Sequence, residues 1–201
     1  LAALLFGSLP FLTVAHMYPQ DAIFETASGL TTTGASVVDS ALPLWNGATL
    51  PHGIESLPYS ILFWRSLIAW LGGMGIVVFV LVIIPFLGIG AAQLYNAEVP
   101  GVKMNSDQLT PRIAGTAKLV WGTYIVLTAI QTVCLKFGGM TLFDAVCHSL
   151  STISTCGFST RQMSIAYYPS PFIQWIFVLF LFLGACNFTP VSYTHLRAHE
   201  T

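Results

Sequence analysis

The stretch DAIFETASGLTTTGAS at residues 21–36 returns as DAVCHSLSTISTCGFS at residues 144–159, and the two align without a gap. Six of the 16 positions are identical, and Gly34 and Gly157 occupy the same place in each copy. Internal repeats are typical of transporters built from repeated membrane units. Each copy is polar and rich in hydroxyl groups, whereas the rest of the chain is strongly apolar. The repeat therefore indicates two related functional segments in one membrane protein.

The composition supports a membrane location. Of 201 residues, 55% are hydrophobic and 7% are charged, whereas a soluble domain carries about 25% charged residues. The net charge of −1 argues neither for nor against nucleic acid as a partner, but the lack of a basic patch that could neutralise phosphates argues against it. The four cysteines lack metal-binding spacing and are expected to be packing residues. No paired carboxylates, nucleophile–base set or phosphate loop supports an enzyme.

Apolar runs alternate with polar connections along the chain. A full span needs about 20 apolar residues, and the runs cover residues 1–15, 61–88, 113–137 and 172–188. Two connections, 18–59 and 138–171, are too polar to cross lipid unaided. The remaining connection, residues 89–112, lies between the second and third apolar runs and holds Lys103 and Arg112. The positive-inside rule therefore places it in the cytoplasm. Arg161, which would then lie on the outer side, weakens this orientation.

The first half of the chain is expected to form one pore repeat. Its order is a membrane span, a short helix that enters the membrane (the pore helix), a polar segment that lines the ion path (the filter) and a second span. It covers residues 1–90, with a truncated opening span, a pore helix and filter at about 20–36, and a second span at about 61–88. Because the chain begins with Leu1 and has no basic segment there, we expect a start inside an apolar helix and no signal peptide. A cytoplasmic loop is expected at 91–112.

The second half is expected to repeat this order. The second pore repeat covers residues 113–190, with its filter at about 153–159 and a truncated last span. The apolar run then stops abruptly, and residues 191–201 are expected to be a foreign tail.

A short helix followed by an extended, hydroxyl-rich segment can present backbone carbonyls to a cation. Carbonyl oxygens can replace the hydration shell of potassium, and the C-terminal end of a helix carries partial negative charge. Glycine allows the φ values that turn successive carbonyls the same way. The alternative is that TTTG and STCG are ordinary Ser/Thr turns. Two ungapped copies with matched flanking spans favour the ion filter.

Charged groups near the first copy leave alternatives open. Arg65 either extends toward the membrane surface or pairs with Glu25 or Asp21. His148 aligns with Glu25 and is expected to be a packed helix residue rather than a ligand. Asp21 and Asp144 are expected to be helix caps.

Gly72, Gly73 and Gly75 lie in the second span, where small residues let helices approach closely. They are expected to pack behind the first filter segment rather than contact an ion.

Five blocks of this sequence resemble the potassium-transporter superfamily that includes the Trk, Ktr, HKT and Kdp proteins, and most of all the TrkH-type subunits of bacterial Trk uptake systems. They cover nearly the whole chain from residue 15 to about 189. The blocks are DAIFETASGLTTTGAS, FWRSLIAWLGGMGIVVFVLVIIP, AAQLYNAEVPG, PRIAGTAKLVWGTYIVLT and FDAVCHSLSTISTCGFST.

The resemblance implies an all-α, potassium-channel-like membrane protein with four span–pore helix–filter–span units, of which two are present here. It implies a multi-pass protein of the bacterial cytoplasmic (inner) membrane, surrounded by lipid, which takes up K⁺ as a homodimer with a cytoplasmic nucleotide-binding regulatory subunit of the TrkA type. The third and fourth pore repeats would come from the parent chain. Since two units cannot enclose a pore, the 201 residues alone are expected not to conduct. A membrane scaffold that retains the repeat without transporting remains the alternative.

The resemblance also implies which residues contact the ion, all of them through backbone carbonyls. In the two copies these are Thr32, Thr33 and Gly34, and Thr155, Cys156 and Gly157. Ala35 and Phe158 would form the outer end of the filter.

Overall fold

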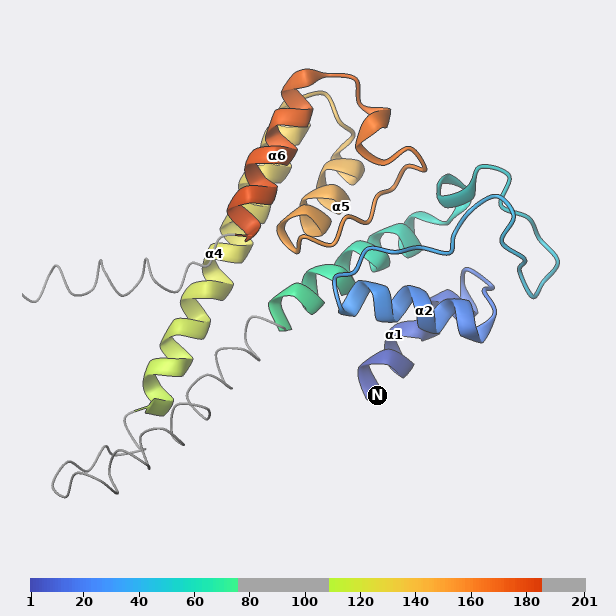
Figure 1. The fold of residues 1–201 in the computed structure, drawn as a ribbon, viewed down its shortest axis with the longest axis horizontal. Helices are drawn as coiled ribbons and strands as arrows, with labels where there is room; N and C mark the ends of the chain where they lie inside the picture. Colours follow the sequence, from blue (N-terminus) through green and yellow to red (C-terminus); the bar gives the residue numbers. More distant parts are fainter. Residues whose placement is uncertain (76–108, 186–201) are drawn as a thin grey trace, which may run out of the picture. The chain divides into compact units, whose positions relative to one another are not determined.

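The computed structural model describes residues 1–75 and 109–185, with the backbone alone described for 109–119 (Figure 1). The second span beyond residue 75, most of the expected cytoplasmic loop, the end of the last span and the expected foreign tail lie outside the described residues. One compact unit comprises residues 1–73 and 125–186, so it contains both copies of the repeat. The first part of α4 belongs to a second unit.

The described residues are helical, joined by loops. The α-helices are α1 (Ala2–Thr13), α2 (Pro19–Leu30), an unlabelled helix over 59–75, α4 (Leu109–Phe137), α5 (Leu142–Ile153) and α6 (Pro171–Ala185). Two 3₁₀ turns, η1 (Gly53–Ser56) and η3 (Ser164–Tyr167), lie in the connections. Within residues 1–75 and 109–185, one isolated β-bridge joins Met17 and Leu44. This confirms the all-helical fold class for the described part of the chain.

The two helices that are expected to be the pore helices, α2 and α5, have 12 residues each. At 1.5 Å per residue such a helix is about 18 Å long, shorter than the ~30 Å hydrocarbon core of a bilayer. Pro19 starts α2 at a position where the missing N–H costs nothing. Thr141 caps α5 by accepting the backbone N–H of Asp144 at 3.1 Å.

The prediction that Asp21 and Asp144 are helix caps is therefore wrong. Both lie inside the first turn, while the capping positions are held by Tyr18, whose side chain makes no cap bond, and by Thr141. A carboxylate in the first turn still interacts favourably with the helix dipole, but its oxygens are free to bind elsewhere.

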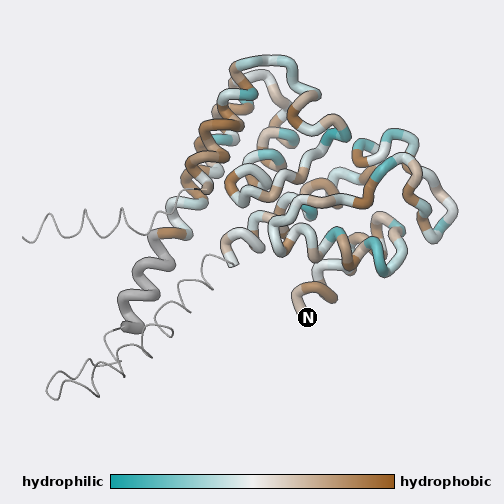
Figure 2. The backbone as a smooth tube through the Cα atoms, viewed as in Figure 1, coloured by the Kyte–Doolittle hydropathy of each residue, from teal (hydrophilic) through white to brown (hydrophobic). Residues whose placement is uncertain are grey.

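Among the described residues, one helix is long and apolar enough to span a membrane. The window Val120–Phe137 in α4 has a mean hydropathy of 1.3 over 18 residues, whereas α1, α5 and α6 are apolar but shorter. The expected third span at 113–137 thus corresponds to α4, which begins earlier, at Leu109. Hydrophobic residues run along nearly all of α6 (Figure 2).

The helices that leave the two filter segments pack against the pore helices in the same way. A Cβ on Gly72 would overlap the carbonyl oxygen of Leu30, and one on Gly184 would lie 2.9 Å from that of Ile153. Leu30 and Ile153 are aligned positions of the repeat. The expected packing role of Gly72 is confirmed, whereas a Cβ on Gly75 would meet nothing within 4 Å.

We expect Gly72→Ala to lower the melting temperature of the purified protein, because overpacking against backbone costs about 1–3 kcal/mol. Gly75→Ala is the matched control on the same helix and should leave the melting temperature unchanged or raise it, since alanine is the better helix former. Thermal unfolding in detergent measures both. Equal effects of the two substitutions would contradict the close approach.

Candidate filter segments and their bracing

The two pore helices end in the same hydrogen-bonded turn. In each copy the backbone N–H groups of two successive residues bind carbonyls three and five positions back, which is a Schellman motif. The bonds are Thr32 N to Gly29 O (3.0 Å) and Thr33 N to Ser28 O (2.9 Å), and Thr155 N to Thr152 O (2.9 Å) and Cys156 N to Ser151 O (3.0 Å). Because the aligned residues make the same bonds, the repeat extends to backbone geometry.

Threonine occupies an unfavourable backbone conformation in both turns. Thr32 has φ = 54° and Thr155 has φ = 55°, in the left-handed region that is a true outlier for β-branched residues. Such strain costs about 1–3 kcal/mol per residue and concentrates at functional sites. Gly34 (φ = 75°) and Gly157 (φ = 94°) follow two residues later. An ordinary turn would carry glycine or asparagine at the threonine positions, so the backbone conformation that both copies share is costly for threonine.

The two candidate filter segments meet at Gly34. A Cβ there would overlap the carbonyl oxygen of Cys156. A Cβ added to Gly157, by contrast, would meet nothing within 4 Å. The structure therefore brings the backbones of the two predicted segments side by side, as two walls of one path would require.

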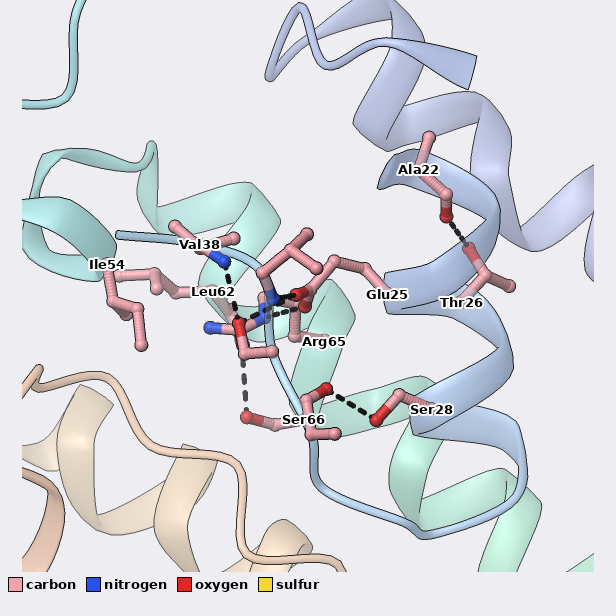
Figure 3. A network of polar contacts seen from close by, with 12 residues as sticks. Ala22, Glu25, Thr26, Ser28, Val38, Ile54, Leu62, Arg65 and Ser66 are labelled. Carbon is pink, nitrogen blue, oxygen red and sulfur yellow. Dashed lines mark hydrogen bonds and ion pairs between the residues drawn. The ribbon is translucent and has the colours of Figure 1, made fainter. Parts of the chain in front are cut away.

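A buried ion pair holds the segment that follows the first candidate filter segment (Figure 3). Arg65 Nε donates to Glu25 Oε2 at 3.0 Å, and the two side chains are 1% and 0% exposed. Glu25 Oε1 accepts the Ser36 hydroxyl at 2.6 Å and the Val37 backbone N–H at 2.8 Å. Arg65 also donates to Ser36 Oγ at 2.9 Å. Of the alternatives for Arg65, the structure selects the pair with Glu25.

The second copy holds the aligned serine with histidine. His148 Nε2 lies 2.9 Å from Ser159 Oγ, and its Nδ1 lies 2.8 Å from the Asp144 carbonyl oxygen. His148 is thus a buried helix residue, as expected, and it contacts the serine that aligns with Ser36. Glutamate and histidine, although chemically different, fill the same structural position.

Charged groups also join the connections that follow the two expected filter segments. Asp144 accepts the Thr160 hydroxyl at 2.6 Å and Arg161 Nη2 at 3.1 Å. Arg161 Nη1 lies 3.7 Å from Glu55 of η1, a longer and partly exposed pair. The positive charge of Arg161, which weakened the orientation predicted by the positive-inside rule, is therefore neutralised by the carboxylates of Asp144 and Glu55.

Asp144 is expected to stabilise the protein at neutral pH. Burial alone would raise the pKa of this carboxyl, but the hydrogen bonds from Thr160 and Arg161 outweigh burial and hold the pKa below its ordinary value of 3.8. A carboxyl with a lowered pKa stabilises the folded state above its unfolded pKa, and this contribution is lost as the pH falls through the folded pKa. Asp144→Asn should therefore lower the melting temperature at pH 7, and the difference from the parent should shrink below about pH 4. A constant difference across the pH range would contradict this account.

The eight predicted filter residues differ in their surroundings. Thr33, Ala35, Thr155 and Gly157 are exposed, Thr32 and Gly34 are half-buried, and Cys156 and Phe158 are buried. The carbonyl of Ala35 accepts the Ser28 hydroxyl at 2.6 Å, so it is turned toward the pore helix. Ion contact by the predicted carbonyls stays a prediction.

Known proteins resemble this chain over most of its length. The family profile "TrkH: Cation transport protein" matches residues 6–200. The Trk system potassium uptake protein TrkH of Salmonella typhimurium is 44% identical over 184 residues, which are 90% of this chain and 35% of the relative. The protein of the same name from Vibrio parahaemolyticus is 46% identical over 185 residues, again 35% of its length. The chain thus spans about a third of these relatives.

A solved structure has the same fold. The crystal structure of the potassium transporter TrkH from Vibrio parahaemolyticus superposes with a TM-score of 0.70 at 42% identity and covers 91% of this chain and 33% of that one. The helical architecture with its paired filter-like segments is therefore that of a potassium-transporter fold. This chain belongs to the TrkH family of cation transport proteins, a family of transporters rather than of enzymes.

Proposed function

We propose that this chain contributes two of four pore units to a potassium uptake protein of the bacterial inner membrane. Potassium crosses between backbone carbonyls of residues 32–34 and 155–157, which replace part of its hydration shell. The observation that carries the proposal is that the two copies have the same turn geometry at aligned positions. A threonine has a left-handed backbone conformation in each copy, Thr32 in the first and Thr155 in the second. The relatives are potassium uptake proteins of Trk systems, which supports the choice of ion.

The complete protein is multi-pass and homodimeric, and a cytoplasmic nucleotide-binding subunit of the TrkA type regulates it. Two of four units leave the ion path open on one side, so residues 1–201 alone do not conduct. Potassium flux through purified 1–201 in liposomes would contradict this expectation.

A full-length chimera tests the proposal. Residues 6–185 of this chain replace the aligned segment of TrkH from Vibrio parahaemolyticus, and the product is expressed in a strain without potassium uptake of its own. We expect growth at low potassium and uptake of a rubidium tracer. A chimera that inserts in the membrane and binds its regulatory subunit, but transports nothing, would favour a scaffold.

A further inference from the structure

The first pore unit receives a side chain from the second. Phe158 follows the second filter glycine, and its side chain is buried. The Arg65 guanidinium lies over its ring, 4.4 Å from Cζ to the ring centroid, in a cation–π contact. The ring also clusters with Ala69, and a Cβ on Gly29 would lie 3.3 Å from the ring edge. Gly29, Arg65 and Ala69 together form what we call the first socket.

The repeat predicts where the equivalent socket of the second unit lies. The pore helices align at an offset of 123 residues, and the outgoing helices, which begin at residues 59 and 171, align at an offset of 112. Gly72 and Gly184, which make the same contact with their pore helices, confirm the second offset. The counterparts of Gly29, Arg65 and Ala69 are therefore Thr152, Phe177 and Leu181.

All three counterparts line one cavity of about 130 Å³, and Val178 lines it with them. We call Thr152, Phe177, Val178 and Leu181 the second socket. A cavity of about 150 Å³ in another protein accommodates benzene, so this volume suits one aromatic ring. Ser151 also lines the cavity, and its Oγ is buried without a hydrogen-bond partner among the described residues.

The exposure of aligned residues indicates that the second socket lacks its cover. Val178 and Leu181 are 57% and 49% exposed. Their counterparts in the first unit, Ser66 and Ala69, are 1% and 0% exposed, beneath the second unit. Phe177 replaces the charged Arg65, so the second socket offers an aromatic wall to an apolar occupant.

We propose that the second socket receives an apolar side chain, about the size of one aromatic ring, from the residue that follows the filter glycine of a third pore unit in the same protein. The inference rests on the proposed function. The side chain in the first socket, Phe158, comes from the second pore unit, which is the next unit along the chain. By the same relation, the side chain in the second socket comes from the third pore unit. The relatives are long enough to contain it, since this chain spans 35% of the Salmonella typhimurium protein.

Disulfide cross-linking in the full-length chimera tests the proposal. Val178→Cys is combined with a cysteine at the residue after the third filter glycine, and mild oxidation is followed by mass spectrometry of the linked peptides. We expect an intramolecular disulfide in most molecules, because only closely facing Cβ atoms can be bridged. Leu179→Cys is the matched control: Leu179 is 54% exposed on the same helix but does not line the cavity, and we expect near-complete loss of the cross-link.

The outcomes separate the socket from the proposed function. Equal cross-linking at positions 178 and 179, a disulfide between two protomers, or no cross-link in a chimera that takes up potassium would overturn the socket. The expected disulfide in a chimera that transports nothing would support the socket and count against the proposed function.

Discussion

Gly34→Ala is expected to abolish potassium uptake by the chimera. The residue has φ = 75°, and an L-residue there costs about 1–2 kcal/mol. The added Cβ would also overlap the Cys156 carbonyl oxygen, which is backbone and cannot move aside by a change of rotamer. The substitution therefore displaces one of the two facing segments, and rubidium-tracer uptake measures the result.

Two other glycines separate the causes of this effect. Gly47 has the same φ of 75°, but a Cβ there would meet nothing within 4 Å, so Gly47→Ala should leave uptake intact. Gly157→Ala adds a Cβ into open space at φ = 94°, so a partial loss is expected. If Gly34→Ala transports as well as Gly47→Ala, the contact between the two filter segments is not needed for transport.

Arg65→Leu is expected to cause the largest loss of stability. It leaves the Glu25 carboxylate buried without its cation, and removing one member of a buried pair costs about 3–5 kcal/mol. That is a large part of a typical stability of about 5–15 kcal/mol. Glu25→Leu/Arg65→Leu should recover most of the melting temperature, because an apolar replacement of a whole buried pair is often tolerated.

Selectivity should not recover with stability. In the double leucine variant the Ser36 hydroxyl and the Val37 N–H lose the Glu25 carboxylate that accepts them, so potassium preference over sodium should stay reduced. Glu25→His/Arg65→Phe gives the first unit the residues found at the equivalent positions of the second unit, His148 and Phe177. Since His148 contacts the aligned Ser159 there, this variant should retain more selectivity. Equal selectivity in both double variants would show that the pair stabilises the protein without positioning the filter segment.

The repeat made the pore helices and the turn positions predictable from sequence. The flanking hydrophobic runs and one ungapped alignment located α2 and α5 to within a few residues, because two short helices with the same sequence pattern at their ends repeat their local signals. The capping prediction failed although the signal was readable: Thr141 precedes Asp144 by three positions, which is the spacing of an N-cap and the first turn.

Long-range contacts were not predictable in the same way. The sequence left Arg65 with two alternatives, since a single arginine near a membrane surface fits either. The burial of Phe158 depends on the neighbouring unit, which local patterns do not encode. The join between Arg161 and Glu55 likewise depends on how two long connections fold back together.

Anomalous diffraction from crystals of the chimera grown in rubidium tests the central claim most directly. We predict a rubidium peak in contact with backbone carbonyl oxygens from both copies, which are those of Thr32, Thr33 and Gly34 and of Thr155, Cys156 and Gly157. A peak that touches side chains alone, or only one copy, would contradict the account of two repeated segments that form one ion filter from backbone.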